Sequence, residues 1–483
     1  MVIAATFQHL LSKQEHPRDV PTRASAWNSR LADHGVRYVR VQWVDLTNTV
    51  RFQVIPATRF AQLCEKARPG IPMTARTLGF INISFAKGFG ETGEHLYVFD
   101  LDSFRICTYA PGHAVVMGWF QLETPSPEGS LAVGICPRTL LHKTVSYRCW
   151  TKAGLTFLCG FESEFILLGA TSPEPDPLTR EGWCRAANLR TGSVQSIVIE
   201  EIADNLQEAR IELQTYHVEG AAGQFEVVTG PLQPLEAADA LVYTRETIHN
   251  TASKHGLRAT FAPRVKMNSF GSGQHVHISV HSSDASDTDP YARADAVKAP
   301  TLTNTERSFV QALVNHLPAL CALMLPTPCS YWRVQDGISS GGTYACWGAE
   351  NKESPIRVCG EKGSHHIEVK IPDATANPYV MLAGLLAVGV QGVRSGAEMT
   401  AGNCMKSVVS MSDEERQQVG MENAKRLPRT VEDARRLFKE DGVLREALGD
   451  SFIAKYISVN ESLEEFMTMP TEEEVVRHLV EHF

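Results

Sequence analysis

Five glutamates and one histidine stand in or beside four short apolar segments that are spread over about two hundred residues of the chain. They are Glu162, Glu164, Glu219, Glu226, His275 and Glu368. Ionised carboxylates are almost never buried without a partner. Several acids that meet at one place call for cations between them, so a metal site is the leading interpretation.

The spacing within these segments indicates that the side chains share a surface. Glu162 and Glu164 are two residues apart in the apolar run LTFLCGFESEFILL. Side chains two apart point to the same face of a strand. The same spacing relates His275 to His277 in QHVHIS and Glu368 to Lys370 in HIEVKIPD. If these strands are neighbours, the acids and His275 converge on one cavity.

The ligand types favour hard divalent ions. Oxygen ligands select Mg²⁺ or Mn²⁺, whereas zinc sites more often use cysteine or several histidines. Two such ions commonly clamp a polyphosphate during phosphoryl transfer. Arg333 in CSYWR and Arg357 in SPIRV are natural counter-charges, because arginine grips carboxylate or phosphate with two hydrogen bonds. The alternative, that the acids lie on the surface of edge strands, is disfavoured by their apolar flanks.

The elements that must position these residues form two groups. A chain of 483 residues is too long for one ordinary core and suggests two domains. The first, residues 23–130, is rich in predicted strands and ends at the Pro/Gly/Ser segment 123–130. It begins with a short helix at 23–35, followed by two alternating strands around the polar turn 45–49. Further strands are predicted at 95–100 and 113–120.

The second predicted domain, residues 131–483, alternates helices with strand-like runs. Its strands are predicted at 155–168, 223–228, 274–280 and 366–371. Its helices are predicted at 140–152, 234–255, 304–325 and 378–397, with charged helices at 413–424, 430–440 and 472–481. Residues 282–290 are predicted to form a surface loop.

The composition excludes several classes of function. A net charge of −9 argues against a nucleic-acid partner, which needs a basic face. The longest apolar run, 379–393, is too short to span a bilayer, and the N-terminus lacks the features of a signal peptide. The 11 cysteines are scattered without a C-x-x-C pair, as in reduced core cysteines. We therefore expect a soluble cytoplasmic protein.

A glycine pattern at 88–93 fits G-x-G-x-x-G but precedes a strand-like run instead of a helix. Without a surrounding βαβ unit, this pattern does not indicate a dinucleotide site. No G-x-x-x-x-G-K-[ST] motif occurs, so an ATP site would not be a P-loop.

The segments that carry the acids together resemble the glutamine synthetase superfamily. The stretches that carry the resemblance include VDLTNTVR, FESEFIL, HVEGAAGQFEVVTGP, GSGQHVHIS, CSYWR, NKESPIRV and HIEVKIPDATANPY. The resemblance implies an α+β fold, with a β-grasp N-terminal domain and a catalytic domain built on an antiparallel sheet with surrounding helices. It also implies a ring homo-oligomer whose active sites lie between subunits, acting on a small-molecule carboxylate and an amine.

The resemblance assigns roles residue by residue. It implies a first metal ion held by Glu164, Glu219 and Glu226 and a second held by Glu162, His275 and Glu368. ATP, the other substrate, would contact His277 and Ser279, with Lys352 and the phosphate-binding Arg357 beside it. The carboxylate substrate would contact Arg333 through its α-carboxylate, the backbone of Gly271, and the side chains of His217 and Lys370. Asp45 of a neighbouring subunit would attract the amine and help remove its proton.

Several positions depart from the family pattern. The flap between Arg333 and Arg357 is one residue longer than usual, and Ser339 or Ser340 stands where a glutamate normally closes over the ammonia site. Phe270 replaces a common asparagine. Lysine or histidine replaces three active-site arginines, at Lys352, His366 and Lys370, and Lys425 aligns with the tyrosine that some bacterial enzymes adenylylate.

Loss of the flap glutamate resembles members that use larger amines, such as γ-glutamylpolyamine and γ-glutamylamide synthetases. The sequence therefore predicts an ATP-dependent ligase that forms an amide through an acyl phosphate, with γ-glutamyl transfer to an amine other than ammonia. The alternatives are a glutamine synthetase that uses ammonia, a non-catalytic structural or regulatory relative, and a related guanidino kinase.

Overall fold

The computed structural model describes residues 23–90, 93–151, 153–283 and 293–483. The N-terminal segment 1–22 and most of the predicted loop 282–290 lie outside these residues, as do two positions of the 88–93 glycine pattern. The rest of the glycine pattern leads into strand β6 (Glu94–Phe99), as predicted.

A nine-stranded sheet organises most of the chain, and its longest strand, β10 (Leu155–Ala170), lies in the interior of the sheet. Its neighbours are β13 (Gln224–Leu232) and β15 (Gln274–Ser282), both antiparallel to it. The sheet continues through β12 (Leu213–Val218) on one side and through β18 (His366–Val369), β17 (Ile356–Cys359) and β16 (Trp347–Ala349) on the other. Two short strands, β11 (Asp176–Pro177) and β14 (Arg258–Thr260), also pair with β10. The acids of β10 are thus not on an edge strand.

The N-terminal part contains a four-stranded sheet in the order β2-β1-β8-β7 and a three-stranded sheet in the order β3-β6-β9. Its other strands are β1 (Tyr38–Val44), β2 (Val50–Pro56), β3 (Gly70–Thr74), β4 (Phe80–Ile81), β5 (Ser84–Phe85), β7 (Arg105–Ile106), β8 (His113–Val116) and β9 (Gly118–Gln121). Its helices are α2 (Arg23–Asp33) and α3 (Ala57–Leu63). The mixture of helices and sheets is confirmed, while the β-grasp arrangement and the boundary at 130 stay predictions.

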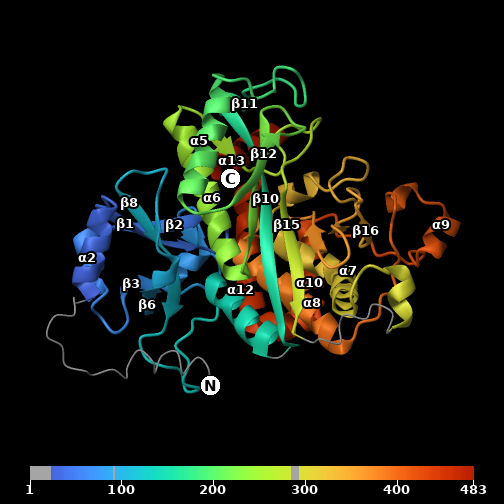
Figure 1. The fold of residues 1–483 in the computed structure, drawn as a ribbon, viewed down its shortest axis with the longest axis horizontal. Helices are drawn as coiled ribbons and strands as arrows, with labels where there is room; N and C mark the ends of the chain where they lie inside the picture. Colours follow the sequence, from blue (N-terminus) through green and yellow to red (C-terminus); the bar gives the residue numbers. More distant parts are fainter. Residues whose placement is uncertain (1–22, 91–92, 152, 284–292) are drawn as a thin grey trace.

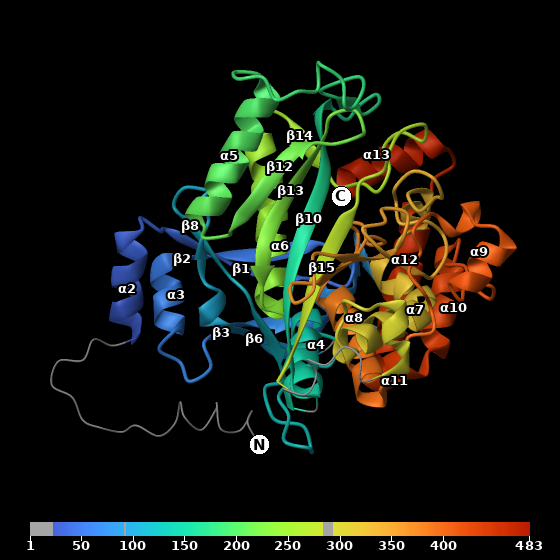
Figure 2. The same ribbon diagram turned by 45° about the vertical axis from the view of Figure 1, so that its right-hand side comes forward.

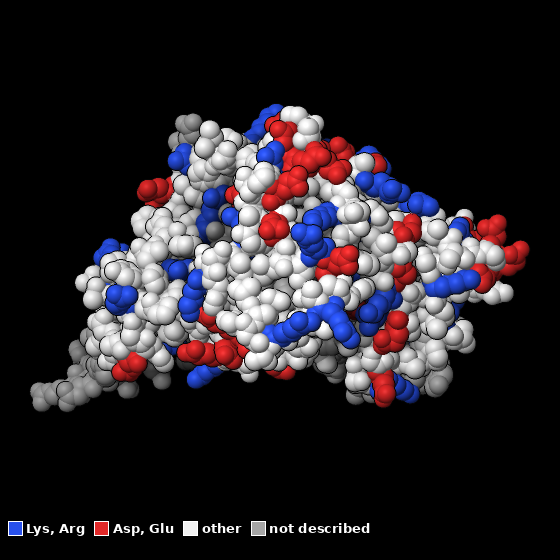
Figure 3. All heavy atoms as spheres, turned by 90° about the horizontal axis from the view of Figure 1, so that it is seen from above, with Lys and Arg blue, Asp and Glu red and all other residues white. Residues whose placement is uncertain are grey.

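The two views of the ribbon agree on the layout around β10. Elements α2, β2, β3 and β8 lie on one side of the long strand, and α7, α8, α9 and α10 lie on the other (Figures 1 and 2). On the face drawn in Figure 3, Lys and Arg side chains are interspersed with Asp and Glu side chains.

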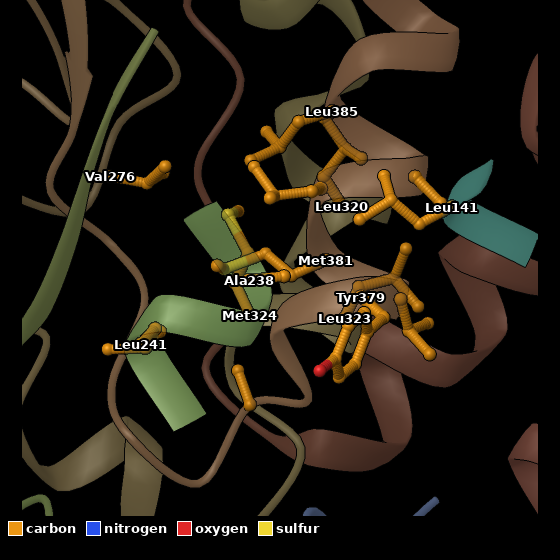
Figure 4. Packing of buried hydrophobic residues seen from close by; sticks show 14 of the residues in the cluster. Leu141, Ala238, Leu241, Val276, Leu320, Leu323, Met324, Tyr379, Met381 and Leu385 are labelled. Carbon is orange, nitrogen blue, oxygen red and sulfur yellow. The ribbon is translucent and has the colours of Figure 1, made fainter. Parts of the chain in front are cut away.

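Two long apolar helices, α7 (Asn304–Met324) and α8 (Pro378–Ser395), form the centre of the hydrophobic core. Figure 4 shows Leu320 and Leu323 of α7 together with Met381 and Leu385 of α8, alongside Val276 of the sheet. Helix α7 starts with a capping box at Thr303, and α8 starts where the Asn377 side chain accepts two backbone N–H groups. These caps fix where the helices begin beside the sheet.

Most predicted elements of the second part are confirmed, among them α6 (Pro234–Lys254), α7, α8, α10 (Val431–Glu440) and α13 (Glu472–His482). The helix predicted at 140–152 is different, because α4 (Pro137–Lys143) continues at 144–151 as a wider π-helix. Helix α9 (Asp413–Gln418) is shorter than predicted. Helices α5 (Val194–Glu208), α11 (Gly442–Leu448) and α12 (Asp450–Met467) were not predicted, although α12 buries Phe452, Tyr456, Val459 and Leu463 at helical spacing.

The 11 cysteines are all free, and all but Cys184 are buried, which agrees with the expectation of core cysteines for ten of them. No helix in the described part of the chain is long and apolar enough to cross a bilayer.

Close packing of α7 on α8 gives a first testable prediction. A Cβ atom added to Gly389 of α8 would stand 2.0 Å from Cε2 of the Phe309 ring of α7. We expect Gly389→Ala to lower stability by about 1–3 kcal/mol, because overpacking displaces a buried ring. Thermal unfolding measures this as a lower midpoint. Gly442→Ala is the control, since nothing lies within 4 Å of its added Cβ. Equal midpoints for the two variants would contradict the prediction.

Candidate active site

Strand register brings the predicted ligands onto one face of the sheet. Glu164 of β10 lies opposite Glu226 of β13, which lies opposite His217 of β12. On the other side of β10, Glu162 lies opposite His275 of β15. Directly opposed residues of antiparallel strands project to the same face, as do residues two apart. The predicted convergence is therefore confirmed for these side chains.

The same face continues onto β18 and β17. His277 of β15 lies opposite Glu368, and Glu368 lies opposite Arg357. Glu219 joins the group from the loop after β12, where its carboxylate accepts the Gly220 N–H at 2.9 Å. Two cavities open over this face, and both are lined by Glu162 and Arg357.

Glu162 is the acid most strongly held by imidazoles. Its two oxygens lie 2.8 Å from His275 Nδ1 and 2.9 Å from His277 Nε2. Burial opposes ionisation, but these hydrogen bonds outweigh it and hold the pKa of Glu162 below its usual range. Ligand atoms of Glu162, His277 and Glu368 lie within 4.8 Å of one another, as do those of Glu162, Glu226 and His275.

Glu368 is buried and surrounded by positive charge. Its Oε2 lies 2.6 Å from Arg357 Nη1, and its Oε1 lies 3.2 Å from Lys370 Nζ. Burial opposes its ionisation, but Lys370 and His275 outweigh it and lower the pKa of Glu368. Lys370 contacts the carboxylate through one ammonium group and lacks the paired N–H donors of an arginine.

The negative charges of Glu219 and Glu226, near β13, are less well compensated by neighbouring positive groups. Burial and the neighbouring Glu164 raise the pKa of Glu219. Burial also raises the pKa of Glu226, and the hydrogen bond from His217 only partly opposes it. Ligand atoms of His217, Glu219 and Glu226 lie within 4.8 Å of one another. A divalent cation would relieve this clustering of buried carboxylates, so the residues present fit such an ion.

Glu164 does not join Glu219 and Glu226 in the group of ligands expected for the first ion. Its Oε2 accepts the Gly273 N–H at 2.8 Å and a hydrogen bond from Gln224 Nε2 at 3.2 Å. Its Oε1 lies 3.8 Å from His275 Nε2. Glu164 thus stands in the same cavity as the other acids but outside the closest three-residue groups.

The cavity over the acids has a volume of about 350 Å³ and is lined by five carboxylates and four cationic side chains. The lining contains all six predicted metal ligands together with His217, Gly271, Arg333, Lys352, Arg357 and Lys370. Lys352 was predicted at the nucleotide, and it lies on this cavity.

The neighbouring cavity, of about 780 Å³, holds the other predicted nucleotide contacts. His277, Ser279 and Arg357 line it, as does His366. The His366 ring lies 5.1 Å from the His277 ring. Burial and the nearby His277 lower the pKa of His366, so its imidazole is uncharged at neutral pH.

Arg333 is buried and lines the smaller cavity. Its Nη2 donates to the Lys370 and Pro372 carbonyls, and its Nη1 has no hydrogen-bond partner among the described residues. Gly271 lies against it, because an added Cβ would stand 2.7 Å from Arg333 Cγ. A buried guanidinium with a free N–H is suited to a carboxylate of a ligand.

Asp45 stands apart from the other predicted residues. It is buried in the turn between β1 and β2, where it accepts hydrogen bonds from Thr47, Thr49 and Arg51. The side chain of Asn377 donates to its carbonyl, so the turn rests on the start of α8. Asp45 lines neither of the two cavities of its own chain. Its role toward a neighbouring subunit stays a prediction.

Three residues of the cavity, Trp183, Gln224 and Ile338, were not singled out from the sequence. Trp183, in the loop between β11 and α5, lines the mouth next to Phe270. Gln224 donates to Glu164 and to the Gly271 carbonyl, which ties the acid to the glycine loop. Gln224 could have been found as a polar residue at the start of an apolar strand, whereas the irregular segment around Trp183 carries no such signal.

Comparison with known proteins identifies the family that the sequence resembles, and solved structures share the fold. Residues 134–478 match the family described as glutamine synthetase, catalytic domain. Protein fluG of Emericella nidulans is 31% identical over 93% of this chain, which spans about half (49%) of that protein. Gamma-glutamylpolyamine synthetase GlnA3 of Streptomyces coelicolor is 29% identical over 90% of this chain and 91% of its own length.

A solved structure titled GmaS/ADP complex is 22% identical, with a TM-score of 0.72, and covers 93% of this chain and 98% of its own. At this identity the likeness concerns the fold. A crystal structure of a novel glutamine synthase homolog gives a TM-score of 0.73 at 23% identity, over 97% of this chain and all of its own.

The contact between His217 and Glu226 predicts proton release on metal binding. The hydrogen bond to Glu226 raises the pKa of His217 to about 9 in the metal-free protein, so the imidazole is protonated at neutral pH. A divalent ion that takes Glu226 as ligand removes this partner, and the pKa falls toward its usual value. We expect Mg²⁺ or Mn²⁺ binding at pH 8 to release a proton.

Calorimetric titration at pH 8, in two buffers with different ionisation enthalpies, measures the proton count. His217→Gln should bind the metal with a smaller release. An identical proton count in the variant and the original protein would contradict the assignment.

Proposed function

Because the chain belongs to the glutamine synthetase family of ATP-dependent ligases, we propose that it joins the γ-carboxylate of glutamate to an organic amine instead of ammonia. The family uses ATP and divalent metal ions. A carboxylate oxygen of the acid attacks the γ-phosphorus of ATP, ADP leaves, and an acyl phosphate forms. The amine nitrogen then attacks the acyl carbon, phosphate leaves, and the amine loses its proton.

Two ions, Mg²⁺ or Mn²⁺, are proposed to lie between the acids of β10, β13, β15 and β18. Bound there, they would neutralise phosphate charge during transfer. The proposed ligands are Glu164, Glu219 and Glu226 for one ion and Glu162, His275 and Glu368 for the other. The clustered carboxylates, with the raised pKa values of Glu219 and Glu226, support this proposal.

Arginines and the two cavities support the proposed positions of the substrates. ATP would occupy the larger cavity, with Arg357 at the wall shared with the smaller one. Arg333, through its free Nη1, would hold the α-carboxylate of the acid. The reacting carboxylate would then face the shared wall, near the acids that bind the ions.

The flap carries the preference for an organic amine. Ser339 and Ser340 line the cavity, and no flap carboxylate between 334 and 356 is among the described lining residues. The Glu353 carboxylate accepts the N–H groups of Gly337 and Ser339, and Asp336 accepts from Thr343. The third acid of the flap, Glu350, pairs with Arg357 at 3.2 Å. All three acids are thus engaged within the chain, and none of them lines the cavity beside Glu219, where an amine larger than ammonia would lie. The similarity to the polyamine synthetase GlnA3 also supports this proposal.

The second candidate is glutamine synthesis from ammonia, which is supported by relatives named glutamine synthetase. One from Rhizobium meliloti is 29% identical over 89% of this chain. A cytoplasmic ring homo-oligomer stays a prediction, in which Asp45 would serve the amine site of a neighbouring subunit. With its carboxylate already hydrogen-bonded within the turn, Asp45 would there act mainly by its charge.

An amine panel tests the proposed activity. Phosphate release from Mg-ATP with glutamate is measured with ammonia, ethylamine, putrescine, spermidine and benzylamine. We expect turnover with an organic amine to exceed that with ammonia. Glu164→Ala should lower it at least about a hundredfold through loss of metal and phosphate positioning. Glu208→Ala, an exposed acid at the end of α5, is the matched control. Strict dependence on ammonia would support the second candidate instead.

The flap predicts a change of amine preference. Ser339→Glu places a carboxylate at a position that lines the cavity, next to where the amine would lie. We expect the KM for ammonia to fall and the KM for the organic amine to rise, each by about tenfold, or about 1.4 kcal/mol. Ser410→Glu, on the exposed segment after α8, is the control. Parallel changes for both amines would contradict the role of the flap.

A further inference from the structure

Two exposed aromatic side chains form the mouth of the smaller cavity. Trp183 is 64% exposed and Phe270 is 37% exposed, and their ring centroids lie 5.4 Å apart at an angle of 52°. Large apolar side chains left this open above a charged cavity cost free energy unless something covers them. Both rings line the same cavity as the five acids.

The two rings are fixed in place by glycine contacts. Phe270 lies on Gly220, where an added Cβ would stand 2.8 Å from Phe270 Cδ2. Gly182 lies so close to the Gly220 carbonyl that an added Cβ would overlap it, and Trp183 follows with a φ of 45°. A positive φ is uncommon for a bulky residue. The backbone contact between Gly182 and Gly220 therefore sets where the indole stands.

The aromatic pair is adjacent to a carboxylate that can receive an ammonium head. Gly220, on which Phe270 lies, directly follows Glu219, and Glu219 accepts the Gly220 N–H. The Glu219 side chain is 25% exposed, which leaves it open to a cation. Ile338 of the flap adds a third apolar side chain to the same lining. An acid thus lies beside an apolar surface.

The charges around the cavity limit the ligand to one cationic group. Every acid among the described lining residues is a candidate metal ligand, and the other charged side chains are the cations Arg333, Lys352, Arg357 and Lys370. A second ammonium group, as in a polyamine, would stand among these cations, and no further acid of the chain's own lining is left to pair with it. An uncharged alkyl or aryl body would instead cover the exposed rings.

We infer that the amine substrate is a primary monoamine with an apolar body, whose ammonium head approaches Glu219 while its body packs on Trp183 and Phe270. This inference rests on the proposed function and restricts its amine substrate to one chemical class. It separates this chain from the polyamine chemistry named for its Streptomyces relative.

The test compares amines and variants by steady-state kinetics with saturating Mg-ATP and glutamate. Benzylamine and hexylamine should show KM values at least about tenfold below that of spermidine. Trp183→Ala and Phe270→Ala should each raise the KM for benzylamine about tenfold through lost apolar contact. The KM for ATP should stay within about twofold, and Trp183→Phe should restore most of the affinity. Phe52→Ala is the matched control, because this exposed aromatic lies on β2 and lines neither cavity.

The outcomes separate the inference from the proposed function. A preference for spermidine, or a benzylamine KM unchanged in both alanine variants, would overturn the inference and leave the ligase activity intact. Absence of phosphate release with every amine would refute the proposed function. Calorimetric titration with benzylamine then decides the binding part of the inference, which is upheld if Trp183→Ala weakens binding about tenfold and overturned if it does not.

Discussion

The constraint on which the site depends is the crowding of five partly or fully buried carboxylates over one face of a sheet. Carboxylates so close together repel one another and lose hydration, and each must be compensated. The chain supplies part of this through His275 and His277 at Glu162, and through Arg357 and Lys370 at Glu368. Around Glu219 and Glu226 the compensation is incomplete, which is why the site calls for divalent ions.

Strand β10 makes this arrangement possible because it lies between β13 and β15. Its two acids are two residues apart, so both project over the same face and meet partners from the strands on either side. A slip of one residue in the register would turn Glu162 and Glu164 to the opposite face of the sheet. The apolar residues of β10 that alternate with the acids, packed in the core, oppose such a slip.

Much of the sheet-borne site could be predicted from the sequence, because residues two apart in a strand must share a face. The long helices α6, α7 and α8 were also predictable from apolar periodicity and their start signals. The order of the strands depends on contacts distant in sequence, and so does the closeness of Gly182 to Gly220 that positions Trp183. The hydrogen bonds that occupy Asp45 depend on a turn whose detailed geometry the residue pattern does not specify.

The two halves of the cavity differ in what a substitution can change. The acids, His275 and Arg357 stand on paired strands, where altering one charge disturbs the compensation of its neighbours. Trp183, Phe270 and Ser339 stand on loops, and none of them takes part in an ion pair within the described chain. Loop residues can therefore alter the shape and polarity of the amine side while the charged face stays unchanged. Under the proposed function, the same phosphate-binding face of the sheet could thus accept different amines after substitutions in the loops around the cavity.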